Sequence, residues 1–195
     1  DVPDELMWMD DRLSFTWISE RDGWRHAYLV DRGTGESTLI TPGPYDVMEL
    51  LHVDEAQQRV YFLASPDSAC QQYLFSIQLD GTGLQRLTPD DVSGTCRYDI
   101  SPDGRAAIMT SSSADRPPVT RLVELPSHRD IRVLEDNSEL REKFEQLARA
   151  ETEFFRVDIG DDVQLDAWCI RPPALEPGKK YPLLVHVYGE PAGQT

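Results

Sequence analysis

An internal repeat constrains the fold of this chain more than any other feature of its sequence. A strand-like segment at residues 15–20 is echoed at 60–65 and again at 107–112, at intervals of 45 and 47 residues. Self-similarity with a period of about 20–50 residues is the mark of proteins built from stacked or radially arranged units. The chain is therefore expected to consist largely of copies of one structural unit.

A second register gives the same period. Segments 28–30 and 39–41 recur as 73–75 and 86–88, again at intervals of 45 and 47 residues, and a third copy begins at 120–123. Two independent registers with one period indicate that the whole unit is repeated, rather than a single strand.

The turns between these segments favour antiparallel strands. The pairs Asp80-Gly81 and Asp103-Gly104 supply the positive φ that tight hairpins need. Four short strands in a period of about 45 residues are typical of a β-propeller blade. We therefore expect a mainly β fold, with a partial β-propeller of about two and a half blades in residues 1–135. A generic antiparallel sandwich is the alternative. Closed propellers carry about 4–8 blades, so further blades are expected before the first residue.

The pattern changes after residue 135. An apolar residue every three to four positions between 136 and 150 predicts a connecting helix. Asp136, with Glu139 three residues on, predicts a capping box at its start. Two strands are predicted at 154–159 and 164–170. The near-continuous apolar run at 181–188 then fits a strand covered on both faces, as in an α/β sheet.

Composition excludes several classes of protein. Asp and Glu (35) outnumber Lys and Arg (19), which gives a formal charge of −16. Nucleic acids and anionic membrane surfaces are therefore not expected as partners, because phosphates are bound by Lys and Arg. The sequence contains no run of about 18 apolar residues, so no membrane segment is predicted in it.

The cysteines and acidic residues give no sign of a metal site. Cys70, Cys96 and Cys169 form no CxxC pair, and they are expected to be small buried hydrophobic residues, with a Cys70–Cys96 bridge left open. Four acids lie close together in sequence: Asp158, Asp161, Asp162 and Asp166. They lack the spacing of a calcium loop and are expected to form a solvated turn. The sequence predicts no metal and no cofactor.

Three segments carry a family resemblance. They are ISERDGWRH at 18–26, RVLEDNS at 132–138 and KKYPLLVHVYGEP at 179–191. In order and spacing they resemble the dipeptidyl peptidase IV branch of the prolyl oligopeptidase family of serine peptidases. The resemblance covers nearly the whole chain.

The resemblance implies a domain organisation and an activity. The family joins an N-terminal β-propeller to a C-terminal α/β-hydrolase domain, with the active site between them. Residues 1–135 would be the C-terminal blades of the propeller, and 136–195 the connecting helix and the first part of the hydrolase domain. The substrates implied are peptides with Pro or Ala second, from which the N-terminal dipeptide is released by a Ser-Asp-His triad. A homo-oligomer and the cellular compartment are left open.

The catalytic triad is not expected within this chain. The family nucleophile lies in a Gly-x-Ser-x-Gly turn, which is absent here, and the order Ser, Asp, His places all three beyond Thr195. The chain alone is therefore predicted to be inactive. Four histidines are expected to be surface or packing residues: His26, His52, His128 and His186. The glutamate pair that binds the substrate's amino terminus is expected before the first residue, and neither Glu20 nor Glu190 is assigned that role.

One functional residue carries over from the family. Tyr188 occupies the position whose hydroxyl helps to form the oxyanion hole, where an O–H donor stabilises the negative charge that develops on the carbonyl oxygen. Glu190 departs from the commoner Gly of that turn. Two alternatives stay open: another member of the same family, such as an acylaminoacyl peptidase, and a propeller binding module without enzymatic activity.

Overall fold

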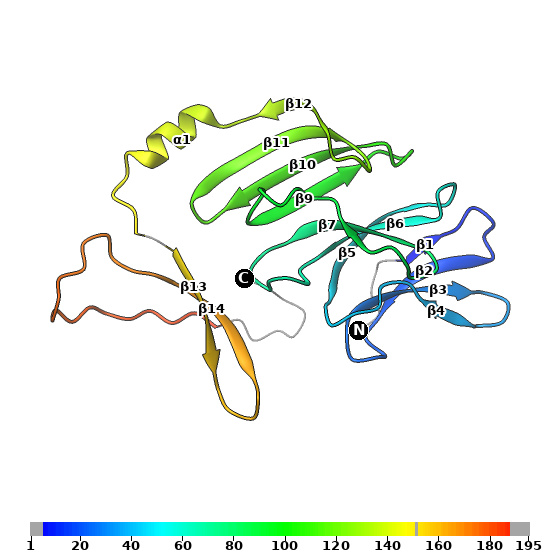
Figure 1. Ribbon diagram of the computed structural model, residues 1–195, viewed down its shortest axis with the longest axis horizontal. Coiled ribbons are helices and arrows are strands. Elements are labelled where there is room, and N and C mark those ends of the chain that lie inside the picture. The colour runs from blue at the N-terminus through cyan, green and yellow to red at the C-terminus, as the bar shows by residue number, and fades with distance from the viewer. Residues whose placement is uncertain (1–5, 151, 188–195) are drawn as a thin grey trace.

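The computed structural model describes residues 6–150 and 152–187. Most of this part of the chain forms three four-stranded antiparallel sheets, which stand side by side in Figure 1. The first sheet consists of β1 (Leu6–Trp8), β2 (Ser14–Ser19), β3 (His26–Asp31) and β4 (Ser37–Leu39). The second consists of β5 (Val47–Asp54), β6 (Arg59–Ala64), β7 (Tyr73–Gln78) and β8 (Gln85–Arg86). The third consists of β9 (Thr95–Ile100), β10 (Ala106–Ser113), β11 (Arg116–Glu124) and β12 (Asp130–Glu135).

Each sheet is a meander in which strands adjacent in sequence are hydrogen-bonded neighbours. This is the arrangement of a propeller blade, and it confirms the predicted mainly β fold class. The described residues hold three such sheets, where the sequence predicted about two and a half blades. The repeated segments correspond to later strands of each sheet, and the first strands, β1, β5 and β9, lie outside them.

The sequence repeat corresponds to a repeated hydrogen bond. Ala27 N donates to Thr41 Oγ1 over 2.9 Å, and Leu74 N donates to Thr88 Oγ1 over 2.8 Å. Both pairs are buried, and the second lies 47 residues after the first. In both sheets a threonine hydroxyl therefore continues the ladder of the third strand at the point where the fourth strand ends.

The centre of the core is the second sheet. Every residue of β6 except Arg59 is buried, and so is every residue of β7 except Gln78. This follows from the arrangement, since the second sheet has a neighbouring sheet on each side (Figure 1). By contrast, all six residues of β12 are exposed, because β12 is an edge strand of the third sheet.

A short helix follows the third sheet. Helix α1 (Ser138–Glu145) is shorter than the predicted segment 136–150 and buries no residue. The predicted capping box is wrong, because Asn137 is the N-cap and its backbone is left-handed, with φ 51°. The Asp136 carboxylate instead accepts a hydrogen bond from Ser138 N over 2.9 Å, while Asn137 Nδ2 donates to Pro118 O of β11 over 2.7 Å.

Beyond the helix, β13 (Thr152–Asp158) and β14 (Gln164–Ile170) form a separate antiparallel hairpin (Figure 1). Its turn has a left-handed backbone at Gly160, Asp161 and Asp162. Asp158 Oδ1 accepts a hydrogen bond from Gly160 N over 2.8 Å, so this acid fixes the turn. The exposed turn agrees with the sequence prediction for the acidic cluster.

The apolar run after the hairpin does not form the predicted strand. Residues 181–187 have no regular structure, and the side chains of Leu183 and Leu184 are 84% and 93% exposed. A strand that is apolar on both faces needs paired neighbours and layers that cover it. In the described part of the chain no strand pairs with these residues.

All three cysteines are free, so the Cys70–Cys96 bridge that the sequence left open is not formed. Cys96 is fully buried, as expected of a small hydrophobic residue, and burial raises the pKa of its thiol to about 11. Burial also raises the pKa of the Cys70 thiol. Both thiols are therefore poor nucleophiles at neutral pH.

Candidate functional site

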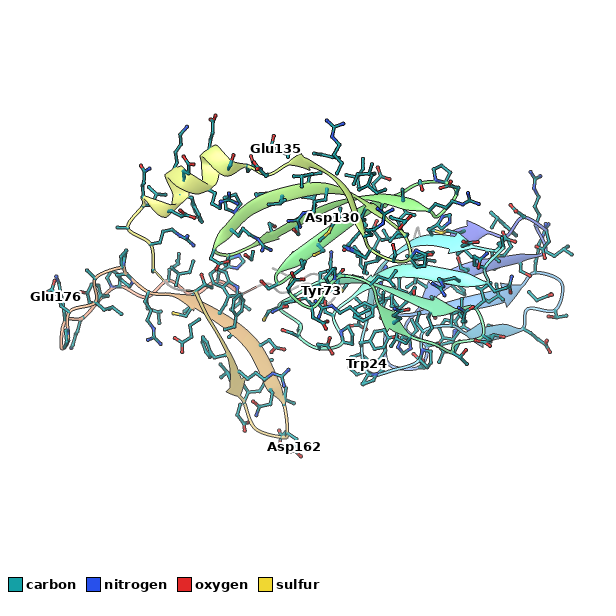
Figure 2. All side chains as sticks on the ribbon, turned by 45° about the horizontal axis from the view of Figure 1, so that its top comes forward. Trp24, Tyr73, Asp130, Glu135, Asp162 and Glu176 are labelled. Atoms are coloured by element: carbon teal, nitrogen blue, oxygen red, sulfur yellow. The ribbon has the colours of Figure 1, made fainter. Side chains whose placement is uncertain are left out.

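A cleft of about 290 Å³ lies where the loops of the first two sheets meet the β13–β14 hairpin. It is lined by Trp24, Pro44, Tyr45, Asp46, Met48, Ser65, Pro66, Asp67, Ser68, Ala69, Arg156 and Asp166. Figure 2 shows Trp24 on the side of the sheets toward which the hairpin, with Asp162 near its tip, projects. Asp130 and Glu135 of β12 lie on the opposite side of the molecule in that view.

Arg25 joins the first two sheets at the rim of this cleft. Its backbone N–H donates to Asp46 Oδ1 over 2.6 Å, and its carbonyl accepts from Val47 N over 2.7 Å. Its guanidinium Nη1 donates to Met48 O over 2.9 Å and also to Val47 O. The β2–β3 turn is thus fixed to the start of β5, and the neighbouring Trp24 is held at the cleft with 41% of its surface exposed.

The cleft carries more negative than positive charge. The carboxylates of Asp46, Asp67 and Asp166 line it, together with one guanidinium, that of Arg156. Arg156 and Asp166 stand directly opposite each other on the hairpin, and Arg156 Nε donates to Asp166 Oδ1 over 3.0 Å. The charges of Arg156 and Asp166 cancel each other. Asp46 and Asp67 therefore give the lining of the cleft a net negative charge.

His26 is a packing residue close to the cleft. Its Nδ1 lies 2.8 Å from Asp22 Oδ2 and its Nε2 lies 3.0 Å from Gly43 O, and the ring is 2% exposed. Both ring nitrogens of His26 therefore have a hydrogen-bond partner within the protein. The hydrogen bond from His26 lowers the pKa of the Asp22 carboxyl. With Nε2 bound to a carbonyl oxygen, this Asp-His pair has no free nitrogen with which to activate a nucleophile.

Among residues 6–150 and 152–187, the other histidines also occupy packing or surface positions. His128 Nε2 lies 2.7 Å from the hydroxyl of Tyr98, and burial lowers the pKa of His128. His52 packs against the ring of Tyr61, at 6.0 Å between centroids, and His186 is exposed. These positions agree with the surface or packing roles expected from the sequence.

Two residues discussed from the sequence, Tyr188 and Glu190, lie outside the described residues. The oxyanion role of Tyr188 stays a prediction. Glu20, to which no role was assigned, is exposed and does not line the cleft. No sequence motif singles out Asp46 or Asp67 as cleft residues. Their loops come from different repeats, and their approach to the hairpin is not visible in any local pattern.

Among the described residues, no cluster of three or more His, Cys, Asp or Glu side chains has an arrangement that would hold a metal ion. The described helix is neither long nor apolar enough to cross a membrane.

Comparison with known proteins gives a consistent picture. The family model for the dipeptidyl peptidase IV (DPP IV) N-terminal region matches residues 2–118. A "Probable dipeptidyl-aminopeptidase B" of Talaromyces marneffei is 34% identical over 183 residues, which cover 91% of this chain and 20% of that protein. A "Probable dipeptidyl peptidase 4" of Aspergillus flavus is 26% identical over 202 residues, which cover 96% of this chain and 26% of that protein.

A solved structure agrees with the sequence relatives. The crystal structure of Porphyromonas gingivalis dipeptidyl peptidase 4 superposes with a TM-score of 0.80 and 29% identity, over 91% of this chain and 24% of that one. The chain therefore spans only a fifth to a quarter of the length of these proteins.

Proposed function

Because the chain belongs to the family of the dipeptidyl peptidase IV N-terminal region, we propose that it is part of a serine peptidase that releases N-terminal dipeptides with Pro or Ala second. Residues 1–135 would contribute the C-terminal blades of a propeller. Residues 136–195 would contribute the connecting helix and the first part of an α/β-hydrolase domain. The names of the relatives support a dipeptidyl peptidase. The serine mechanism, the preference for Pro or Ala and the division into domains are part of the proposal.

The observation that carries this proposal is the position of the cleft. It is bounded on one side by loops of the first two blades and on the other by Arg156 and Asp166 of the hairpin. A peptidase whose active site lies between a propeller and a hydrolase domain needs a cavity at their junction. A cleft between the sheets and the hairpin, lined by aromatic, apolar and charged side chains that suit a peptide, supports the proposal.

In the proposed reaction, a serine hydroxyl attacks the carbonyl carbon of the substrate's second residue, and a histidine takes its proton. The histidine returns this proton to the leaving amine as the amide bond breaks, and water then hydrolyses the acyl-enzyme. Negative charge develops on the carbonyl oxygen whenever a tetrahedral intermediate forms. The Tyr188 hydroxyl would donate a hydrogen bond to that oxygen, which stabilises the transition state more than the ground state. The serine, aspartate and histidine would lie beyond Thr195.

The test uses the full-length protein expressed from the reading frame that contains this chain. We expect turnover of an Xaa-Pro anilide, and we expect Tyr188→Phe to lower kcat by about 10²–10³-fold with little change in KM. The chain Asp1–Thr195 alone should show no turnover. Two results would contradict the proposal: a following sequence without a Gly-x-Ser-x-Gly turn, or turnover by the chain alone that Tyr188→Phe abolishes.

A further inference from the structure

We propose that the cleft between the first two blades and the hairpin binds a basic side chain, lysine or arginine, of the peptide substrate. This inference rests on the proposed function in one respect, since it takes the ligand to be a peptide. The catalytic centre would hold the N-terminal dipeptide, so the basic residue would follow the bond that is cut.

The first argument is the shape and lining of the cleft. One wall is formed by Trp24, with the side chains of Pro44, Met48 and Pro66 beside it. Trp24 keeps a large exposed surface there although it lies in a tight turn, between Gly23 and Arg25. An indole face that is accessible in a concave site is the best partner among side chains for a cation or for an alkyl chain that ends in one.

The second argument is charge complementarity. With Arg156 paired to Asp166, the lining of the cleft keeps the two carboxylates of Asp46 and Asp67, while the Arg25 guanidinium at the rim is bonded to the carbonyl oxygens of Val47 and Met48. The field of the whole chain, at −16, has the same sign. A cationic side chain is therefore attracted to the cleft and an anionic one is repelled.

The third argument is that the cleft is already formed. Arg25 fixes Asp46 and Met48 by hydrogen bonds, so these groups need not be ordered when a ligand binds. Tyr45 is packed between His26, at 5.8 Å between ring centroids, and Phe62, at 6.4 Å. A rigid lining lowers the entropic cost of binding and favours selectivity for one kind of side chain.

The experiment measures binding to the chain Asp1–Thr195 directly, without catalysis. Two hexapeptides, Ala-Pro-Gly-Lys-Gly-Gly and the same sequence with norleucine in place of lysine, are titrated by calorimetry and by tryptophan fluorescence. We expect the lysine peptide to bind about tenfold more tightly. This advantage should shrink when the salt concentration is raised from about 0.05 M to about 0.5 M, because salt screens exposed charges.

Two variants locate the site. Asp46→Asn keeps an oxygen that can accept from Arg25 N but removes the charge, and Trp24→Leu removes the indole face. Each is expected to abolish most of the preference for lysine. The matched controls are Asp103→Asn and Trp8→Leu. Asp103 also accepts from a backbone N–H, that of Arg105, and Trp8 is 52% exposed, but neither lines this cleft.

The outcomes separate this inference from the proposed function. Equal binding of the two peptides, or a lysine preference that survives both Asp46→Asn and Trp24→Leu, overturns the inference. If the longer protein releases dipeptides with no preference for a downstream lysine, the inference fails and the peptidase stands. If the chain binds the lysine peptide selectively while the longer protein releases no dipeptide, the peptidase fails and the ligand class of the cleft stands.

Discussion

Two buried histidines of this chain differ in how their ring nitrogens are bonded. His26 lies between the Asp22 carboxylate and the Gly43 carbonyl, so each of its ring nitrogens has a partner. His128 has the hydroxyl of Tyr98 at Nε2, and its buried Nδ1 has no hydrogen-bond partner among the described residues. Burial therefore favours its neutral form and lowers its pKa.

His128 should make the stability of the protein sensitive to mild acid. Its pKa in the folded state lies below the ordinary value of 6.5, so the unfolded chain binds the proton more tightly. The contribution to stability is complete above pH 6.5, falls as the pH drops through that value, and levels off below the folded pKa. Asp130 and Arg121, which face His128 and form an ion pair at 3.5 Å, oppose each other in their effects on this pKa.

The measurement is urea unfolding between pH 7.5 and pH 5, which is the range in which histidine titrates. His128→Asn is the test variant, because asparagine tolerates the left-handed backbone at this position, φ 54°, and does not titrate. We expect the wild type to lose more stability than this variant as the pH falls. His186→Asn, at an exposed position, should behave like the wild type. Parallel curves for the wild type and His128→Asn would exclude the effect.

At the residue scale, the sequence predicted which side chains are buried or exposed better than it predicted their hydrogen-bond partners. It predicted surface or packing positions for the histidines, and it placed Cys96 in the interior. It did not predict that Asp22 and Gly43 would enclose His26, or that Tyr98 would reach His128. Asp22 lies four residues away in the same turn, Gly43 lies 17 residues away in a loop, and Tyr98 lies in β9, 30 residues before His128. No local sequence pattern singles out these contacts.

At the scale of elements, a threonine at the end of each of the first two blades accepts a backbone hydrogen bond that a carbonyl oxygen accepts elsewhere in the ladder. Thr41 and Thr88 each accept a hydrogen bond from a buried N–H of the third strand. Thr88 has a second partner, because its Oγ1 lies 2.8 Å from the hydroxyl of Tyr98 in β9. This second bond connects the second blade to the third.

Replacing these threonines by valine should destabilise the protein unequally. Thr41→Val leaves one buried N–H without a partner, at a cost of about 1–3 kcal/mol. Thr88→Val removes the same bond and also the one to Tyr98, so it should cost about 1 kcal/mol more. Thr38→Val, at an exposed position of β4, is the control and should change the free energy of unfolding little. Equal losses for Thr41→Val and Thr88→Val would show that the bond to Tyr98 contributes nothing.

The strands of the blades were predicted because their pattern occurs two or three times along the chain. The hairpin strands were predicted from one occurrence each, at 154–159 and 164–170, and are present as β13 and β14. The helix cap and the strand predicted at 181–188 also came from one occurrence each, and neither is formed in the described residues. Asn137 displaced Asp136 as the cap because its side chain bonds to β11, a contact that no local pattern encodes.

At the scale of the whole molecule, apolar surface is distributed unevenly. The second blade is covered on both faces, whereas the hairpin exposes apolar side chains along both of its strands. These are Phe154, Phe155, Val157, Leu165, Trp168 and Ile170. Exposed strand edges and apolar patches favour pairing between chains, and the charge of −16 opposes it.

We expect the isolated chain to associate reversibly, and more strongly at high salt, because salt screens the repulsion between chains. Phe154 and Trp168 are direct partners across the hairpin, so the double variant Phe154→Ser, Trp168→Ser should reduce the association. Leu84→Ser, at an isolated exposed position, is the control. The measurement is the molar mass in solution, by analytical ultracentrifugation at two salt concentrations. A monomer under both conditions would refute the prediction.

The paired threonines also bear on how such a molecule arises. A gene segment of 47 codons encodes both the strand that needs a hydrogen bond and the hydroxyl that supplies it. When such a segment is copied by unequal recombination, the new unit arrives with its interior polar group already satisfied. A single duplication can therefore change the number of blades. The new blade needs no further mutation to supply an acceptor for its buried N–H.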